Sequence, residues 1–363
     1  MITRAKFQNF KALKDAEITF DERLTVIVGP NGSGKSSILK GIYWMCQIGG
    51  VKTYAAGVES ILAALNTTYN GTNDNQIVEV CDSEKKTIQF ASHPTNVLVK
   101  NERFGSQQNV GFGPQLNWSC KVITSKGDDA DYRTPKYDFG FQPAELIQLD
   151  ASRLAAPSST TTTPPLLLAD GSGLASLMAY FKLSDEPRYD QIVQLFKTVI
   201  PNINGIRLTR VGVGHGPLGE GLIFDLPTRK GVTAAALSDG TLYALGLIVK
   251  ILDPQRPKLL LIDDIDHGFH PKAQLALVDI LHKLLDEIPD LQIIATSHSP
   301  YILSGLKWDE IRVTSLKEDG TATIAPLKSH PNFETWKEAM SPGEFWSHAG
   351  EEWINQLPEK VSQ

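Results

Sequence analysis

Hydrophobic and polar positions alternate with two different periods along the chain, and each period predicts one kind of element. A short apolar run ends at Val28, and residues 36–47 then follow a helical period. The apolar face of that helix comprises Ile38, Leu39, Ile42 and Met45. Residues 76–123 change to short alternating runs separated by Asn, Gly and Pro, which is typical of an antiparallel β layer.

Helical and strand periods also succeed one another in the middle and the last third of the chain. A Ser/Thr/Pro stretch at 158–165 is of low complexity and predicts a mobile loop. Beyond it the pattern predicts helices at 174–183 and 189–199, separated by residues 185–187, and strands at 205–213 and 221–226. It then predicts a helix at 238–252, a strand at 258–262, a helix at 271–285 and a strand at 291–296. Apolar strands that alternate with helices indicate a largely parallel sheet covered on both faces.

Composition excludes several classes of protein. With 41% hydrophobic and 21% charged residues, the 363-residue chain is globular rather than disordered, and its net charge of −6 argues against a general nucleic-acid coat. The three cysteines are Cys46, Cys81 and Cys120, and their wide spacing excludes a disulfide framework. No apolar stretch approaches the roughly 18 residues of a membrane span, and the first residues lack a secretory apolar core. We therefore expect a soluble, cytoplasmic protein without a membrane partner.

The strongest chemical signal is the run Gly29-Pro-Asn-Gly-Ser-Gly-Lys35-Ser36, which fits G-x-x-x-x-G-K-[ST] between a strand and a helix. Glycines let backbone N–H groups turn toward phosphate oxygens, Lys35 adds a point charge at the β/γ-phosphates, and Ser36 can ligate Mg²⁺. The alternative is an ordinary glycine-rich turn before a helix. The residues expected to bind nucleotide here are Gly29, Asn31, Gly32, Ser33, Gly34, Lys35, Ser36 and Ser37.

A second signal is an apolar strand, residues 258–262, that ends in two carboxylates. Phosphate-loop proteins hold Mg²⁺ through water with an acid at this position, so Asp263 is the candidate metal ligand. Asp264 would then face the attacking water as a base or an orienting group. A strand followed by an aspartate-rich turn is the structural alternative, and the phosphate loop makes the functional interpretation the stronger one.

A third motif, Leu237-Ser-Asp-Gly-Thr241, opens a helix, and Ser238 is also a good N-cap. The order of phosphate loop, this motif, acidic strand and Ala295-Thr-Ser-His298-Ser-Pro resembles ABC-type ATPase heads. Within these the chain is similar to the soluble SMC/RecF/OLD-like branch rather than to transporter subunits. The first strand (2–10) and the motifs at 170–174 and 268–271 suit that branch. The resemblance implies an α/β P-loop NTPase fold: an ABC-type ATPase head with a mixed sheet, an antiparallel β layer and an inserted helical lid.

The resemblance also implies how the site works. In such heads the signature loop of one subunit binds the γ-phosphate held by the other, so Ser238 and the Gly240 backbone would act on a second copy. His298 matches the histidine that contacts the γ-phosphate and the water, although a capped turn would also explain it. Two ATP molecules with Mg²⁺ would lie between two heads, which makes the active form at least a homodimer.

Three features of the motifs depart from the family pattern or leave a gap in it. The usual second acidic residue is Glu, whereas this chain has Asp264, which is shorter by one methylene; this shortening would slow hydrolysis. The signature has Asp239 where transporters have Gly. The glutamine that such heads use at the nucleotide has four candidates, which are Gln89, Gln107, Gln108 and Gln142.

The order of the motifs divides the chain into a split ATPase core (1–50 and 237–330), an inserted β layer and helical lid (51–236), and a Trp-rich tail (331–363). The insertion has no heptads for a coiled coil, and too few residues follow the core for an appended nuclease domain, so we expect a stand-alone head. The tail tryptophans Trp336, Trp346 and Trp353 either dock a partner or pack on the chain's own sheet.

The function that follows is an ATPase that dimerises around ATP and controls an effector, a nuclease or toxin, in a prokaryotic anti-phage defence module. One alternative is an ATP-stabilised scaffold with little hydrolysis. Another is a RecF-like DNA-repair ATPase, which would bind DNA in a basic groove and in a salt-dependent manner.

Overall fold

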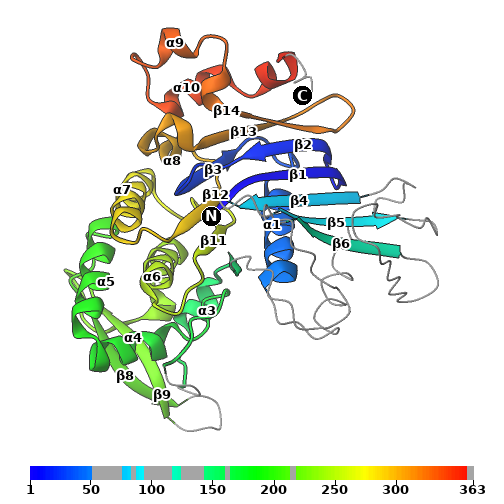
Figure 1. Ribbon diagram of the computed structural model, residues 1–363. Helices are drawn as coiled ribbons and strands as arrows, with labels where there is room; N and C mark the ends of the chain where they lie inside the picture. Colours follow the sequence, from blue (N-terminus) through cyan, green and yellow to red (C-terminus); the bar gives the residue numbers. More distant parts are fainter. Residues whose placement is uncertain are drawn as a thin grey trace.

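A six-stranded sheet with the order β14-β13-β3-β12-β11-β7 forms the centre of the molecule (Figure 1). The structure is a computed structural model that describes residues 1–50, 76–82, 87–93, 117–123, 143–159, 164–212 and 218–357. The strands of this sheet are β3 (Leu24–Val28), β7 (Ala144–Ile147), β11 (Leu259–Ile262), β12 (Gln292–Thr296), β13 (Ile311–Leu316) and β14 (Ala322–Pro326). All neighbours are parallel except β13 and β14. Strands β3, β11 and β12 are buried along their whole length, as expected of parallel strands covered on both faces.

A second, antiparallel sheet has the order β2-β1-β4-β5-β6. Its strands are β1 (Ile2–Phe10), β2 (Leu13–Thr19), β4 (Gln76–Asp82), β5 (Thr87–His93) and β6 (Asn117–Ile123). Helix α1 (Lys35–Gly50) contacts β4 and β5 of this sheet and β7, β11 and β12 of the central one. Apolar side chains of the helix such as Ile38 and Ile42 share one core with Phe7 of β1 and Ile294 of β12. The antiparallel β layer predicted at 76–123 is thus an extension of the first hairpin.

Helices cover the other face of the central sheet. They are α3 (Ala151–Ala155), α4 (Leu174–Ser184), α5 (Glu186–Val199), α6 (Asp239–Leu252), α7 (Pro271–Glu287) and α8 (Pro300–Gly305). A small sheet, β10-β9-β8, lies beyond α4 and α5 and consists of β8 (Gly205–Gly212), β9 (Leu218–Asp225) and β10 (Val232–Thr233). The two helices of the predicted lid, α4 and α5, belong to the same apolar cluster as α6 and α7.

The strand β7 is the clearest difference from the sequence-based boundaries, which place residues 144–147 in the insertion. The structure pairs β7 in parallel with β11, so this strand completes the central sheet. The apolar run is only four residues long and is interrupted by Glu145, which hides the signal. The carboxylate of Glu145 lies 2.6 Å from Lys250 Nζ of α6, and this ion pair allows a charged residue at the border of the core.

Two predicted boundaries also shift. Helix α5 begins at Glu186, within the predicted separator, because Asp185 accepts a hydrogen bond from the amide of Arg188 and Pro187 stands in the first turn, where proline is tolerated. In the low-complexity stretch, Ser158 exchanges backbone hydrogen bonds with Glu220, while residues 160–163 lie outside the described residues.

The C-terminal elements pack on the central sheet and on α8. They comprise α9 (Phe333–Trp336), α10 (Pro342–Ala349) and the 3-10 turns η2 (Trp308–Glu310), η3 (Leu327–Ser329) and η4 (Glu352–Gln356). A further 3-10 turn, η1 (Ala234–Ala236), precedes α6 and contacts α3 and β9. Trp353 is 7% exposed, and Trp336 and Trp346 pack against the main core. The tail tryptophans therefore pack within the chain. Among the described residues, none of the helices has the length and apolar character needed to cross a membrane.

Candidate active site

The predicted phosphate loop connects β3 to α1 and is built against the neighbouring strand β13. Thr314 of β13 donates a hydrogen bond from Oγ1 to the carbonyl of Val28 (3.0 Å), and the same atom lies 2.6 Å from Ser33 Oγ. Gly29 has φ +143°, and a Cβ there would lie 2.2 Å from the carbonyl oxygen of Thr314. Both the backbone conformation and the neighbouring strand therefore require glycine at this position.

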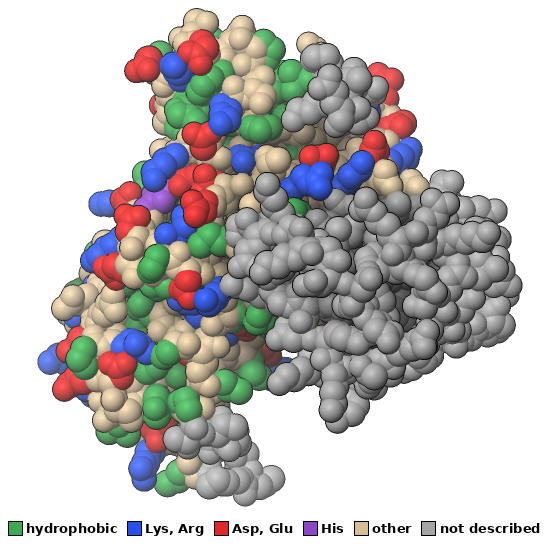
Figure 2. Space-filling model, in the orientation of Figure 1, with side chains coloured by type: hydrophobic (Ala, Val, Ile, Leu, Met, Phe, Trp, Pro, Cys, Tyr) green, Lys and Arg blue, Asp and Glu red, His purple; other side chains and the backbone are tan. Residues whose placement is uncertain are grey.

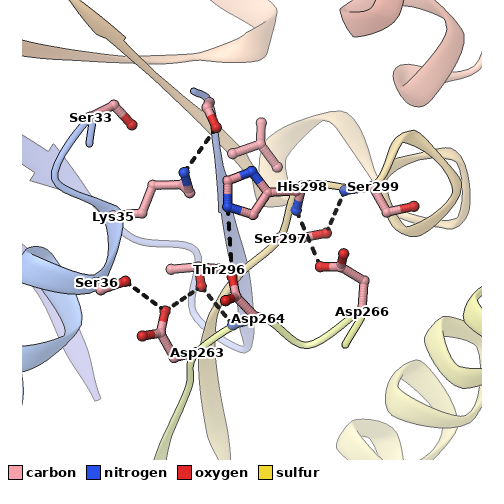
Figure 3. Close-up of polar contacts among 12 residues, drawn as sticks. Ser33, Lys35, Ser36, Asp263, Asp264, Asp266, Thr296, Ser297, His298 and Ser299 are labelled. Atoms are coloured by element: carbon pink, nitrogen blue, oxygen red, sulfur yellow. Dashed lines mark hydrogen bonds and ion pairs between the residues drawn. The ribbon is translucent and has the colours of Figure 1, made fainter. Parts of the chain in front are cut away.

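Lys35 lies folded across this loop. Its Nζ donates to the carbonyls of Gly29 and Pro30, each at 2.9 Å, and the residue is only 5% exposed (Figure 3). Burial lowers the pKa of Lys35, and the carboxylates of Asp264 and Asp263 oppose that shift. Both acceptors are neutral, so among the described residues the ammonium has one N–H donor left for an anionic ligand. Around it, Ser33 is buried, Asn31 and Gly32 are exposed, and Gly34, Ser36 and Ser37 are half-buried.

Asp263 follows the last residue of β11 and is held by hydroxyls from two sides. Ser36 Oγ donates to Asp263 Oδ1 at 3.0 Å, and Thr296 Oγ1 of β12 donates to the same oxygen at 2.7 Å (Figure 3). The phosphate loop and the acidic strand, which are 227 residues apart in sequence, are thus joined directly. Thr296 lies inside the sequence motif at 295–300, and the parallel pairing of β12 with β11 is what brings its hydroxyl to Asp263.

The oxygens of Ser36 and Asp263 fit Mg²⁺, which prefers oxygen ligands and takes only one or two from the protein when phosphates supply others. Ser36 and Asp263 together offer only a few oxygens to such an ion. The pair would therefore bind the ion together with a phosphorylated ligand rather than alone.

Asp264 leaves the strand in a left-handed conformation, with φ 52°, and its amide nitrogen donates to Thr296 Oγ1 at 2.8 Å. Its carboxylate oxygen Oδ1 lies 3.7 Å from Nε2 of His298, which follows β12 (Figure 3). The amide of His298 in turn donates to Asp266 Oδ1 at 3.2 Å. Burial, together with the charge of Asp263, raises the pKa of Asp264, which makes it a better proton acceptor than an ordinary aspartate.

A cavity of about 250 Å³ opens beside these carboxylates, toward helix α6. Its polar lining includes Asp263, Asp264, Gln148 and His267, and Tyr243 and Phe269 are among its aromatic walls. Gln148 follows β7 as Asp263 follows β11, because Ile147 and Ile262 are register partners. The sequence analysis missed this glutamine because it missed β7; a polar residue after an apolar run was the available signal.

The sequence offers four candidate glutamines for contact with the nucleotide. Gln89 lies in β5 of the antiparallel sheet, and Gln107, Gln108 and Gln142 lie outside the described residues.

The predicted signature residues lie at the start of α6. Ser238 is the N-cap, and within the described part of the chain its hydroxyl exchanges hydrogen bonds with Thr241 and not with the phosphate loop. A Cβ on Gly240 would lie 2.0 Å from the carbonyl oxygen of Gly268, so glycine lets α6 approach the turn that follows Asp264. The structure therefore brings together Lys35, Ser36, Asp263, Asp264 and His298, and leaves Ser238 exposed outside that group.

Two family models match separate parts of the chain. The model described as "AAA ATPase domain" matches residues 1–137, and the model described as "AAA domain, putative AbiEii toxin, Type IV TA system" matches residues 165–304. Each covers one part of the site: the first includes the phosphate loop and the second includes the signature, the acidic strand and His298.

Among curated proteins, the chain is 22% identical over 348 residues to the Septu protein PtuA of Bacillus thuringiensis, which covers 93% of this chain and 81% of that protein. It is 34% identical over 68 residues to the DNA replication and repair protein RecF of Geobacter metallireducens, 19% of this chain and 18% of that protein. The first similarity spans the site, and the second is local.

Solved structures identify the fold. An SMC head bound to the C-winged helix domain of ScpA superposes with a TM-score of 0.59 at 16% identity, covering 89% of this chain and 96% of that one. An SMC head with an extended coiled coil from Pyrococcus furiosus, bound to the C-terminal domain of ScpA, gives 0.58 at 14% identity, covering 93% and 98%. The predicted P-loop NTPase fold and the predicted resemblance to SMC-type heads are both confirmed.

Proposed function

We propose that this chain, which has the fold of an SMC-type ATPase head and matches AAA ATPase models in two parts, binds and hydrolyses ATP with Mg²⁺. The observation that carries the proposal is the direct link between the two halves of the site, in which Ser36 and Thr296 both donate to Asp263. Such a carboxylate at the end of a parallel strand, beside the phosphate-loop serine, is the arrangement with which P-loop NTPases hold Mg²⁺ for phosphoryl transfer.

Each residue has a role that its surroundings support. Lys35 and the loop amides bind the β- and γ-phosphates, and Ser36 and Asp263 hold Mg²⁺, which when bound supplies positive charge at the phosphate oxygens. Asp264 accepts a proton from the attacking water, and His298 orients that water and the γ-phosphate. The 3.7 Å between Asp264 and His298 leaves their polar atoms available to a water molecule rather than committed to each other. Gln148 lines the cavity beside Asp263 and Asp264, where its side chain would hold water by hydrogen bonds.

The nucleotide also joins two copies of the chain in this proposal. Ser238 and the Gly240 amide stand at the N-terminus of the 14-residue helix α6, where the helix dipole favours an anion. Because the Ser238 hydroxyl makes no hydrogen bond to its own phosphate loop among the described residues, a second copy is the source of the phosphate that it would bind. The active form is then at least a homodimer with ATP between the heads.

The proposed partner is an effector protein, a nuclease or a toxin, in a prokaryotic anti-phage defence module. Similarity to the Septu protein PtuA over 93% of the chain supports this proposal. Co-purification of the chain from its native host, followed by mass spectrometry, tests it directly: a nuclease or toxin recovered with ATP present supports the proposal, and its consistent absence contradicts it.

A scaffold that holds ATP without turning it over is the second candidate, and the short Asp264 side chain is the observation that favours it. A RecF-like DNA-repair function has weaker support. The similarity to RecF is confined to 68 residues, and on the face in Figure 2 Lys and Arg side chains are interspersed with Asp and Glu rather than gathered into one groove. Single-turnover hydrolysis separates the first two candidates, since persistent ATP in the dimer would identify the scaffold.

Phosphate release from Mg·ATP by the full chain tests the enzyme claim. We expect release by the unsubstituted protein and a fall of about 100-fold or more in Lys35→Ala, because the phosphate charge loses its buried counter-ion. Lys14→Ala is the matched control, since Lys14 is exposed and pairs only with Asp319 at 3.3 Å among the described residues. Equal rates in the two variants would exclude the assigned site, and no release with or without the partner and DNA would exclude the enzyme.

A further inference from the structure

The turn that begins at Asp264 and the loop that carries His298 follow the paired strands β11 and β12, and hydrogen bonds join them. The amide of Ile265 donates to the carbonyl of Thr296 at 2.9 Å, and the amide of His298 donates to Asp266 Oδ1 at 3.2 Å (Figure 3). These bonds hold the two segments together near the strand ends. The relative position of Asp264 and His298 therefore depends on how the two segments are fixed to each other.

Gln274, in the first turn of α7, links the same two segments at a second place. Its Nε2 donates to the carbonyl of Phe269 at 3.0 Å, and its Oε1 accepts a hydrogen bond from the hydroxyl of Ser299. Phe269 lies at the end of the turn that begins at Asp264, and Ser299 directly follows His298. The side-chain amide of Gln274 therefore forms a bridge between the segments that carry both groups.

The partners of Gln274 favour one orientation of its amide. Ser299 Oγ accepts from the amide of Tyr301 at 3.2 Å, which leaves the hydroxyl proton for Gln274 Oε1. Turning the amide by 180° would place its oxygen against the carbonyl oxygen of Phe269, and two acceptors repel each other. Gln274 is 6% exposed and Ser299 is 8% exposed, so breaking the bridge would leave buried polar groups without partners.

The stability of the fold alone can also explain a buried glutamine, and Gln292 is an example in the same chain. It is 1% exposed, donates to the carbonyls of Ile2 and Asp21 at 2.8 and 3.0 Å, and accepts from the amide of Ile2 at 2.7 Å. Gln292 begins β12, whereas Thr296, which contacts the carboxylate of the site, ends it. The partners of Gln274, in contrast, belong to the two segments that extend from the site.

We propose that Gln274 is a positioning residue that fixes the separation of Asp264 and His298 in the proposed ATPase site. This inference rests on the proposed function. A proton acceptor must come within about 3 Å of the water that it activates, and a displacement of about 1 Å can lower a rate on the order of 100-fold. The phosphate loop belongs to a different part of the chain. Loss of the bridge therefore slows bond breaking and leaves the affinity for nucleotide unchanged.

Single-turnover hydrolysis of Mg·ATP by the full chain, together with its Mg·ATP affinity from calorimetry, tests the inference. Gln274→Met keeps the length of the side chain but removes both the donor and the acceptor. We expect it to hydrolyse ATP about 10- to 100-fold more slowly, with an affinity within about 2-fold of that of the unsubstituted protein. Gln292→Met is the matched control, because it also removes a buried amide. It should lower the melting temperature comparably and keep the single-turnover rate within about 2-fold.

A double substitution tests whether the bridge itself is responsible. Ser299→Ala removes the same link from the other side, so the double variant Gln274→Met/Ser299→Ala should be no slower than the slower of the two single variants. Losses that multiply would show that the two residues act independently and would overturn the inference. Where Gln274→Met does not fold, as melting curves without nucleotide reveal, Ser299→Ala alone must show the slower hydrolysis at unchanged affinity.

Two further outcomes would overturn the inference and leave the proposed function standing. One is an equal single-turnover rate for Gln274→Met and Gln292→Met, and the other is a loss in Gln274→Met that lies in Mg·ATP affinity alone. An unsubstituted protein that releases no phosphate, with or without its partner, would instead overturn the proposed function and this inference together.

Discussion

At the scale of the residue, the backbone conformation at position 264 explains why the residue there is Asp. Its φ of 52° is a left-handed conformation, which Asp and Asn adopt more readily than longer side chains because they bond locally. The family resemblance leads to an expectation of Glu at this position. The left-handed turn, held by the hydrogen bond from the Asp264 amide to Thr296, gives a physical reason for the shorter acid.

We expect Asp264→Asn to retain this backbone and to bind Mg·ATP, while single-turnover hydrolysis falls by about 10²- to 10⁴-fold because the proton acceptor is lost. Asp264→Glu should lower the free energy of unfolding by about 1 kcal/mol, since Glu is less favourable in the left-handed region. Asp279→Asn, an exposed change on α7, is the control. An Asp264→Asn protein that hydrolyses ATP at the normal rate would remove Asp264 from the mechanism.

Two glycines of the phosphate loop offer a matched pair. A Cβ on Gly29 would lie 2.2 Å from the Thr314 carbonyl oxygen, whereas Gly32, with φ +81°, has open space around it. Gly29→Ala should therefore lower the free energy of unfolding by about 3 kcal/mol or more, and Gly32→Ala by about 1 kcal/mol from backbone strain alone. Denaturant titration of both variants measures the difference, and similar values would mean that β13 does not constrain the loop.

At the scale of the element, the long and periodic segments were predictable from sequence and the short or charged ones were not. Helices α6 and α7 were predicted to within a few residues, because their apolar faces recur at helical spacing over several turns. Strand β7 was missed because four residues with a central glutamate give no periodicity. Gln148 was missed with it, since only the parallel pairing of β7 and β11 places it beside Asp263.

In the C-terminal segment the sequence does not decide between two structures. Three tryptophans on an acidic stretch suit either a partner protein or the chain's own core. The structure buries Trp353 and leaves Trp336 half-buried. Trp353→Ala should lower the free energy of unfolding by about 3 kcal/mol, and Trp336→Ala by much less, as expected for removing a buried and a half-buried ring. Denaturant titration checks this pair of values. A neutral Trp353→Ala would mean that the segment is not part of the fold.

The surroundings of His330 lead us to expect that the stability of this segment depends on pH. Its ring lies 5.0 Å from those of Phe345 and Trp353, its Nδ1 accepts from the amide of Asn332, and burial lowers its pKa from the ordinary value of 6.5. A base with a lowered pKa stabilises the fold above its unfolded pKa, and this contribution is lost as the pH falls, because the unfolded chain takes up the proton first.

The melting temperature should therefore fall more between pH 7.5 and pH 5 in the unsubstituted protein than in His330→Asn. The asparagine keeps an acceptor for the Asn332 amide but does not titrate. Parallel pH profiles for the two proteins would show that His330 remains free to ionise.

At the scale of the whole molecule, sheet topology explains why the two parts of the proposed ATPase core lie far apart in the sequence. Strand β3 lies between β12 and β13, so the phosphate loop from the start of the chain is enclosed by elements from its end. The phosphate loop is therefore enclosed only once β12 and β13, from the last quarter of the chain, have paired with β3. The signature at α6, in contrast, belongs to the helical layer and remains exposed, which is why we infer that a second copy completes the site.

The central claim, that one copy holds ATP on Lys35 and another completes the site with Ser238, is tested most directly by mixing two inactive variants. Lys35→Ala removes the phosphate-loop charge and Ser238→Arg blocks the signature, so each alone should release almost no phosphate. In a mixed dimer one site has both lesions and the other has neither. We expect the mixture to recover a substantial fraction of the normal rate, and a mixture no more active than its separate components would contradict the account.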